Sequence, residues 1–247
     1  MGKSKNSDAS FIMQGSILAI ASIISRIVGL IYRIPLTAII GKTGNDYYGT
    51  AYSIYNIILI MSSFSLPLAV SKLVASRMGN GRAKDAFRVF KGALGFAIVS
   101  GGFGALLLYF GADYFTGTLL KTPLSAIALK VLAPTVFVVA LLGVFRGFFQ
   151  GLNTMMPSAF SQVAEQILNA IVSVVAAYML YSYGKKVGAV LGDADAYAAA
   201  YGAAGGTIGT GTGAVVGLLF MAFVLAVYLK VFKKQMKREH HTKIDSY

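Results

Sequence analysis

The chain has 247 residues, of which 56% are hydrophobic and 13% are charged, and its mean hydropathy is +0.69. A soluble domain of this size does not have such a composition, so the sequence predicts an all-α integral membrane protein. There is no cysteine, and the two histidines, His240 and His241, lie in the polar C-terminal tail. Disulfides, thiolate catalysis, Cys-ligated metals and a histidine site within the membrane are therefore excluded.

Six apolar stretches are long enough to cross a bilayer, which takes about 20 helical residues for ~30 Å of hydrocarbon. In chain order they cover 11–40, 47–74, 92–110, 124–145, 158–181 and 203–231. They predict a bundle of six transmembrane helices, with residues 1–247 as one lobe that ends in a basic tail or linker at 232–247. The first stretch is too long for a signal-peptide core, so we expect it to be retained.

The first stretch carries Arg26 and, seven residues later, Arg33. An arginine near the bilayer centre costs at least ~2.5–3.5 kcal/mol, so it usually faces a bundle interior or a wet cavity. Seven residues advance a helix by about 700°, which places both guanidinium groups on one face about 10 Å apart. We therefore expect these arginines to serve a ligand or a charge partner.

The second stretch carries a polar and aromatic face formed by Tyr48, Tyr52, Tyr55 and Asn56. Such a face more often forms an interface belt or a helix contact than a sugar site. Three prolines lie in or near three of the predicted spans, and each removes a backbone hydrogen bond and can kink its helix. They are Pro35, Pro67 and Pro134.

The fourth stretch contains Lys130 and ends at Arg146, and both side chains are long enough to snorkel to the membrane surface. The fifth stretch has amide, hydroxyl and carboxyl groups at helical spacing: Ser158, Gln162, Glu165, Gln166, Asn169 and Ser173. A buried carboxylate needs a partner or a proton, and Arg26, Arg33 or Arg146 could supply the charge for Glu165. Both interhelical hydrogen bonding and direct involvement in transport remain open for this face.

The sixth stretch has glycines at every fourth position, Gly205, Gly209, Gly213 and Gly217. This spacing gives the helix a smooth ridge that another helix can approach closely. A static helix contact and a sliding surface are both compatible with the pattern.

The placement of lysine and arginine predicts the orientation, because these residues accumulate in short cytoplasmic loops. They gather in the N-terminal tail, between the second and third stretches, and in the C-terminal tail, whereas Asp46, Asp113, Asp193 and Asp195 lie in the alternate loops. We therefore expect a multi-pass protein with both termini in the cytoplasm. The net charge of +13 is then a topology signal and does not indicate a nucleic-acid partner.

Three strings of residues carry a resemblance to a known family: Ser25-Arg26-Ile27-Val28-Gly29, Leu66-Pro67-Leu68-Ala69-Val70-Ser71-Lys72, and Arg146-Gly147-Phe148-Phe149-Gln150-Gly151 followed by Ser161-Gln162-Val163-Ala164-Glu165-Gln166. The chain resembles the polysaccharide-transporter branch of the multidrug/oligosaccharidyl-lipid/polysaccharide (MOP) exporter superfamily, near its lipid II flippase and stage V sporulation protein B-like members. The resemblance covers nearly the whole chain. It implies one lobe of a MATE-like flippase.

The resemblance also implies a function. Such a protein would move undecaprenyl-pyrophosphate-linked saccharides, lipid II or a polysaccharide precursor, across the bacterial plasma membrane by alternating access. It would not be an enzyme and would need no cofactor, with coupling to Na⁺, H⁺ or the membrane potential left open. Family members have two six-helix lobes, so we expect a second lobe, in the same chain or as a partner, to complete the cavity.

In this family the arginines of the first span are candidates for binding pyrophosphate, which carries over to Arg26 and Arg33. Arginine forks suit a dianionic pyrophosphate in a membrane cavity. Further candidates for substrate binding are Arg146, Gln162, Glu165, Gln166 and Asn56. Two alternatives remain: a cation-coupled multidrug exporter, which predicts an acidic cavity, and a non-transporting scaffold or remnant, whose polar stripes only hold helices together.

Overall fold

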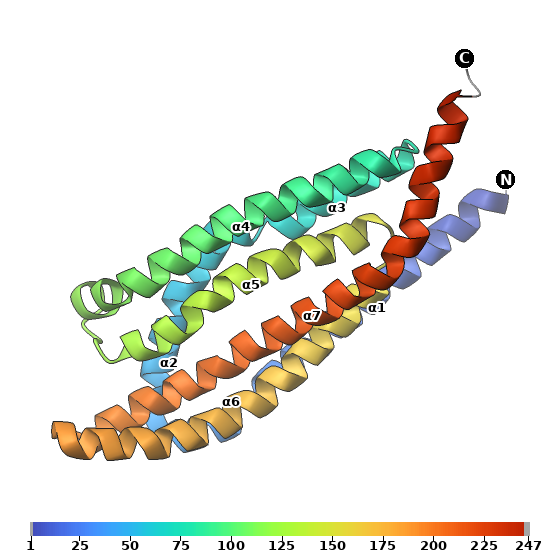
Figure 1. Cartoon of the computed structure of the whole chain (residues 1–247). Helices are drawn as coiled ribbons and strands as arrows, with labels where there is room; N and C mark the ends of the chain where they lie inside the picture. The colour runs from blue at the N-terminus through green and yellow to red at the C-terminus, as the bar shows by residue number, and fades with distance from the viewer. Residues whose placement is uncertain (1, 245–247) are drawn as a thin grey trace.

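The computed structural model describes the backbone of residues 2–244 and the side chains of residues 13–230. In the described part the chain forms the helices α1 (Gly2–Ile31), α2 (Arg33–Ser63), α3 (Leu66–Gly79), α4 (Ala83–Asp113), a π-helical turn η1 (Tyr114–Leu119), α5 (Ser125–Gly151), α6 (Met156–Leu191) and α7 (Ala194–Ile244) (Figure 1). Six helical segments within it are long and apolar enough to cross a membrane. The protein is an all-α membrane protein with six candidate spans.

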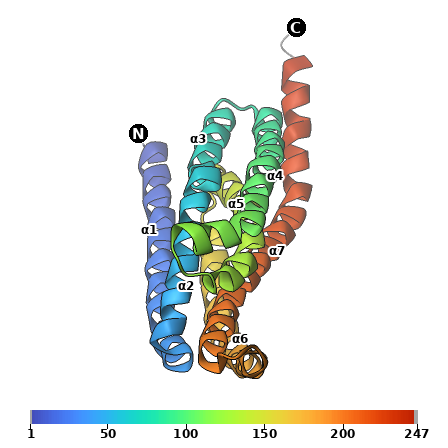
Figure 2. The ribbon, with the colours of Figure 1, turned by 90° about the vertical axis from the view of Figure 1, so that its left-hand side faces the viewer.

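The spans run back and forth, so that the N-terminal and C-terminal helix ends and the α3–α4 turn lie at the same end of the bundle (Figures 1 and 2). Helix α5 lies at the centre and packs against α2, α3, α4 and α7, and half of the residues in its most apolar segment are buried. Helix α1 is peripheral, because only 6% of the residues in its apolar segment are buried and it packs mainly on α6. The helix that carries Arg26 is therefore held to the bundle along one side.

The first predicted span is interrupted between its two arginines, which corrects the expectation of one helix over 11–40. Pro35 has no N–H to donate to the carbonyl of Ile31, and the regular helix stops at Ile31 and resumes at Arg33. Tyr32 keeps right-handed helical angles (φ −70°, ψ −19°), so the chain bends there without reversing. The reversal comes at Gly41 (φ 68°, ψ −174°), a conformation that is open essentially to glycine alone.

The second predicted span is also bent, because α2 ends at Ser63 and α3 begins at Leu66, one residue before Pro67. Helix α3 then lies against a ridge of small residues on α5 that the sequence analysis did not single out. A Cβ atom added to Gly147 would lie 3.0 Å from the Cα atom of Pro67, and one added to Gly151 would lie 2.7 Å from the carbonyl oxygen of Ser71. Helix α5 itself continues unbroken through Pro134.

Helices α6 and α7 form a tight hairpin along the predicted glycine ridge. A Cβ atom on Gly205 would lie 2.6 Å from the Cα atom of Ala177, and one on Gly213 would lie 2.5 Å from the carbonyl oxygen of Glu165. The ridge therefore packs directly on the backbone of α6. The hairpin turns at Gly192 (φ 92°) and Asp193, whose Oδ1 accepts the N–H of Ala196 at 3.0 Å and caps α7.

Several helices are longer than the apolar stretches that predicted them. The clearest case is α7, which continues without a break through residue 232 to Ile244, although a separate tail or linker was expected there. The residues beyond the apolar run are mostly strong helix formers without glycine or proline, so nothing ends the helix. The side chains of that tail, His240 and His241 included, and residues 245–247 lie outside the described part of the structure.

The buried side chains form two clusters. One joins Tyr48, Tyr55, Leu129 and Leu132 with small residues of α7. The other is rich in phenylalanine, with the rings of Phe90 and Phe148 4.7 Å apart. Tyr48 and Tyr55 are 3% and 4% exposed, so these two tyrosines of the polar and aromatic face form helix contacts.

Candidate functional site

A hollow of about 560 Å³ opens between α1, α2, α6 and α7. Both predicted arginines contribute to its wall, Arg26 from α1 and Arg33 from the first position of α2. The break at Tyr32 does not separate them, because Tyr32 keeps helical backbone angles and its N–H donates to the carbonyl of Val28 at 3.2 Å. The lining residues are Ser25, Arg26, Gly29, Leu30, Tyr32, Arg33, Tyr52, Gln166, Asn169 and Thr210.

Within the part of the chain whose side chains are described, the two arginines of the hollow have no acidic partner. Among the residues with described side chains, the ion pairs are Arg88–Asp85, Lys130–Asp113 and Arg146–Glu165, and no carboxylate lines the hollow. Charged residues within a membrane are normally paired or serve a ligand. The hollow, hereafter called the cationic hollow, therefore presents two fixed positive charges to whatever enters it.

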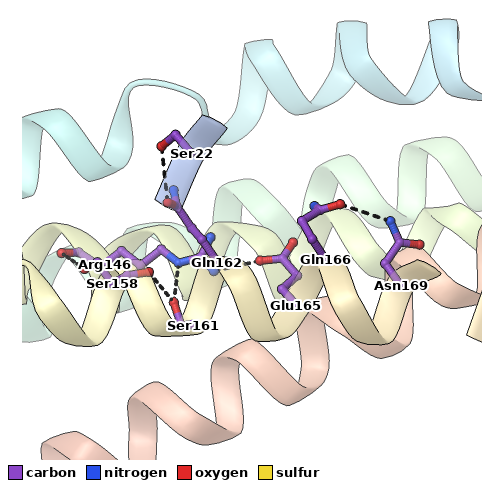
Figure 3. A network of polar contacts seen from close by, with 8 residues as sticks. All are labelled: Ser22, Arg146, Ser158, Ser161, Gln162, Glu165, Gln166 and Asn169. Atoms are coloured by element: carbon purple, nitrogen blue, oxygen red, sulfur yellow. Dashed lines mark hydrogen bonds and ion pairs between the residues drawn. The ribbon is translucent and has the colours of Figure 1, made fainter. Parts of the chain in front are cut away.

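Neutral polar groups line the other part of the cationic hollow and are connected across three helices. The hydroxyl of Tyr52 bonds to Thr210, and Thr210 Oγ1 donates to Asn169 Oδ1 at 3.3 Å. Ser173 Oγ also donates to Asn169 Oδ1, at 2.9 Å. Asn169 Nδ2 in turn donates to Gln166 Oε1 at 3.5 Å (Figure 3). We call Tyr52, Gln166, Asn169 and Thr210 the neutral wall.

The polar residues nearer the α5–α6 turn form a separate network (Figure 3). Arg146 Nη2 lies 2.7 Å from Glu165 Oε2, and Arg146 Nε donates to Ser161 Oγ at 2.8 Å. The two charged side chains are 14% and 16% exposed. A Cβ atom on Gly217 would lie 3.6 Å from both Arg146 Nη2 and Glu165 Oε2, so α7 also approaches this ion pair.

This network selects Arg146 as the partner of Glu165 from the three arginines considered in the sequence analysis. Neither residue lines the cationic hollow, and each neutralises the other. The geometry therefore supports interhelical bonding between α5 and α6 for this part of the polar face.

Glutamine side chains attach α1 to α6. Ser22 Oγ lies 3.4 Å from Gln162 Oε1, and Gln14 Oε1 accepts the N–H of Met155 at 3.2 Å just before α6 begins. Gln162 does not line the cationic hollow. The side chain of Gln162 therefore contributes to a contact between α1 and α6.

Two other charged or polar residues lie away from the cationic hollow. Asn56 is exposed on α2 and is not part of the lining. Lys130, which we expected to snorkel, donates to Asp113 Oδ2 at 2.8 Å.

The sequence analysis missed Tyr32 and Thr210. Tyr32 directly precedes Arg33, and its hydroxyl bonds to the Tyr48 hydroxyl at 3.0 Å. Thr210 lies between two glycines of the glycine ridge, where the sequence analysis considered only the glycines.

Comparison with known proteins identifies the family of this chain. The profile of the family described as "Polysaccharide biosynthesis protein" matches residues 12–239, nearly the whole chain. The chain belongs to this family. Among curated relatives, the lipid II flippase MurJ of Bacillus subtilis (strain 168) is 28% identical over 181 residues, which cover 70% of this chain and 33% of the relative.

Two further family relatives come from the same organism. Stage V sporulation protein B is 29% identical over 181 residues, covering 73% of this chain and 35% of its own length. The uncharacterized membrane protein YabM is 30% identical over 175 residues, which cover 70% of this chain and 32% of the relative. The chain thus spans about a third of the length of the curated relatives it matches.

A solved structure shows the same fold. A MOP superfamily transporter from Pyrococcus furiosus superposes with a TM-score of 0.67 at 18% sequence identity, covering 87% of this chain and 44% of that one. The family match, the relatives and this fold place the chain in the polysaccharide-transporter branch of the MOP superfamily.

Proposed function

We propose that this chain forms one lobe of a flippase that moves an undecaprenyl-pyrophosphate-linked saccharide, lipid II or a polysaccharide precursor, to the outer leaflet of the bacterial plasma membrane. The observation that carries the proposal is the pairing of Arg26 and Arg33 in one membrane-embedded hollow without a carboxylate among its lining residues. A pyrophosphate diester has two negative charges, and two arginine forks supply charge and bidentate hydrogen bonds to match them.

The cationic hollow is open, so a substrate within it would need a further wall. We infer that a second six-helix lobe, in the same chain or as a partner, supplies this wall and that the two lobes alternate access to the site. The basic residues around the α3–α4 turn, near the described helix termini, favour a cytoplasmic position for that end.

The alternative of a cation-coupled multidrug exporter predicts an acidic cavity in this lobe. The only carboxylate of the polar face of α6, Glu165, lies outside the cationic hollow and is bonded to Arg146. An anionic ligand therefore fits the described residues better than an organic cation. The scaffold alternative predicts that changes to Arg26 act only through the amount of folded protein.

Complementation distinguishes these functions. The complete gene product, unchanged or with one substitution, is expressed in bacteria depleted of their own lipid II flippase, and membrane abundance is measured by immunoblot. We expect Arg26→Ala to abolish growth, Arg26→Lys to impair it, and Lys130→Ala to leave it intact, because Lys130 lies outside the cationic hollow. Normal growth of Arg26→Ala at wild-type abundance would contradict the proposed role.

A further inference from the structure

The cationic hollow is larger than its two arginines require. Its volume of about 560 Å³ falls in the range of roughly 300–1,000 Å³ in which protein pockets hold drug-sized ligands. A pyrophosphate group held between two guanidinium groups is much smaller than such a ligand. The hollow therefore has space for a further part of the same ligand beside the phosphates.

The neutral wall has the chemistry of a site for a hydroxyl-rich ligand. Gln166 and Asn169 contribute amides, which both donate and accept hydrogen bonds, and Tyr52 and Thr210 contribute hydroxyl groups. None of these side chains has a formal charge, so they add nothing to the binding of phosphate beyond hydrogen bonds. Neutral donors and acceptors placed together suit the hydroxyl and amide groups of a sugar.

Internal hydrogen bonds hold the neutral wall in place before any ligand arrives. Asn169 Oδ1 lies within hydrogen-bond distance of the hydroxyl groups of Ser173 and Thr210, and Asn169 Nδ2 donates to Gln166 Oε1 at 3.5 Å. This bond leaves Gln166 Nε2 as a donor for a ligand in the hollow. A side chain held by its neighbours loses little freedom on binding, which increases its contribution to affinity.

Ser25 adds a further hydroxyl group to the residues that line the cationic hollow. Its Oγ atom is buried and has no hydrogen-bond partner among the described residues, although Ser25 lines the cationic hollow. Ser22, one turn earlier, donates to the carbonyl of Leu18 at 2.9 Å, which is the usual solution for a serine in a helix. A buried hydroxyl without a partner is costly, and a rotation of the Ser25 side chain that turned its hydroxyl to a ligand oxygen in the hollow would remove that cost.

We propose that the neutral wall is a saccharide subsite, which binds the sugar attached to the pyrophosphate, with Gln166 as the residue that distinguishes a sugar-linked lipid from the bare lipid pyrophosphate. This inference rests on the proposed function, because it takes the arginines as the phosphate site. The proposed subsite assigns different parts of the ligand to different helices. The arginines of α1 and of the start of α2 bind the phosphates, and the side chains of α6 and α7 bind the sugar. A site built to hydrogen-bond a ligand rejects the analogue that lacks the bonding group.

The test compares two probes on the full-length protein in nanodiscs of one lipid composition. The probes are undecaprenyl pyrophosphate and undecaprenyl-pyrophosphate-linked N-acetylglucosamine, and dissociation constants are measured by native mass spectrometry. We expect the sugar to tighten binding to the unchanged protein by about 5-fold to 10-fold, the effect of one or two net hydrogen bonds. Gln166→Leu should lose this gain and bind undecaprenyl pyrophosphate within about twofold of the unchanged protein.

Gln162→Leu is the matched control, because it removes the same amide one turn earlier on α6 and outside the cationic hollow; it should keep the sugar gain. Thr210→Val is a second variant of nearly unchanged shape, and it should reduce the gain if Gln166→Leu does not fold.

Three results would overturn the proposed subsite. These are the absence of a sugar gain in the unchanged protein, an undiminished gain in whichever of the Gln166→Leu and Thr210→Val variants folds, and an equal loss of affinity for both probes in that variant. Failure of the unchanged protein to bind either probe would instead overturn the proposed function itself.

Discussion

At the scale of single residues, the arginines within the predicted spans of this protein fall into two kinds. Arg146 has a carboxylate at 2.7 Å and a serine hydroxyl at 2.8 Å, so its charge is satisfied within the bundle. Arg26 and Arg33 share the cationic hollow and form no ion pair among the described residues. The first kind stabilises the arrangement of helices, and the second is available to a ligand.

The paired arginine leads to a prediction about stability. Removing one partner of a largely buried ion pair leaves the other charge uncompensated, at a cost of about 3–5 kcal/mol for a fully buried pair. Glu165→Leu should therefore lower the unfolding temperature markedly, and the double variant Arg146→Met with Glu165→Leu should recover most of the loss. Thermal unfolding in one detergent measures both. If the two single effects simply add in the double variant, the pair does not act as a unit.

The unpaired arginines lead to a prediction about chemistry. Lysine keeps the charge but loses the planar fork of donors, so Arg26→Lys should weaken binding of a lipid pyrophosphate while Arg26→Ala weakens it further. Loss of a charged hydrogen bond costs ~1.5–3 kcal/mol, which corresponds to roughly 10-fold to 150-fold in affinity. Isothermal titration of detergent-solubilised protein checks the order. Equal affinities of the lysine and alanine variants would show that bidentate geometry is not used.

Much of the cationic hollow was predictable at this scale, and some of it was not. Arg26 and Arg33 stood out because a charge within a membrane needs a reason. The partner of Glu165 could not be chosen from the sequence, because three arginines were available and only the packing of α5 on α6 selects Arg146. Thr210 was missed because its role depends on its bond to Asn169 on another helix.

At the scale of helices, hydropathy predicted the number of spans better than their ends. An apolar stretch marks the part of a helix that crosses hydrocarbon, whereas the helix continues until a residue ends it. Helix α6 therefore runs on past residue 181 through Lys185 and Lys186 to Leu191, and Gly192 then turns the chain. Pro35 indicated a kink in the first span, but the sequence did not show that the helix is interrupted at Tyr32.

The glycine ridge of α7 leads to a prediction at this scale. A Cβ atom on Gly209 would lie 2.5 Å from the carbonyl oxygen of Asn169, so Gly209→Ala forces α6 and α7 apart. We expect a destabilisation of about 1–3 kcal/mol, as for overpacking in a core. Gly95→Ala on α4 is the control, since a Cβ atom there meets nothing within 4 Å. Equal unfolding temperatures for the two variants would contradict a tight α6–α7 contact.

At the scale of the whole molecule, the two ends of the bundle should face different compartments. The chain has no cysteine, so a single introduced cysteine reports its own position. We expect Asp193→Cys, in the α6–α7 turn, to react with a membrane-impermeant maleimide in intact cells, and Asn80→Cys, in the α3–α4 turn, to react only after the membrane is opened. The reverse pattern of labelling would invert the proposed orientation.

The whole molecule also has an open side at the cationic hollow, which we propose is covered by a second lobe. Arg26, Arg33, Gln166 and Asn169 all line this open hollow. A lobe of this kind would hold its substrate against a fixed bundle while the partner lobe opens the site to one leaflet or the other.

The central claim is that the cationic hollow binds the pyrophosphate of a lipid carrier. The most direct measurement compares the affinities of the full-length protein in nanodiscs for undecaprenyl pyrophosphate and for undecaprenyl phosphate. The same two affinities are measured for Arg26→Ala, Arg33→Ala and the control Lys130→Ala. We predict that the unchanged protein and the control prefer the pyrophosphate by on the order of 10-fold, and that either hollow variant loses this preference. Equal affinity of the unchanged protein for both lipids, or an intact preference in Arg26→Ala, would contradict the claim.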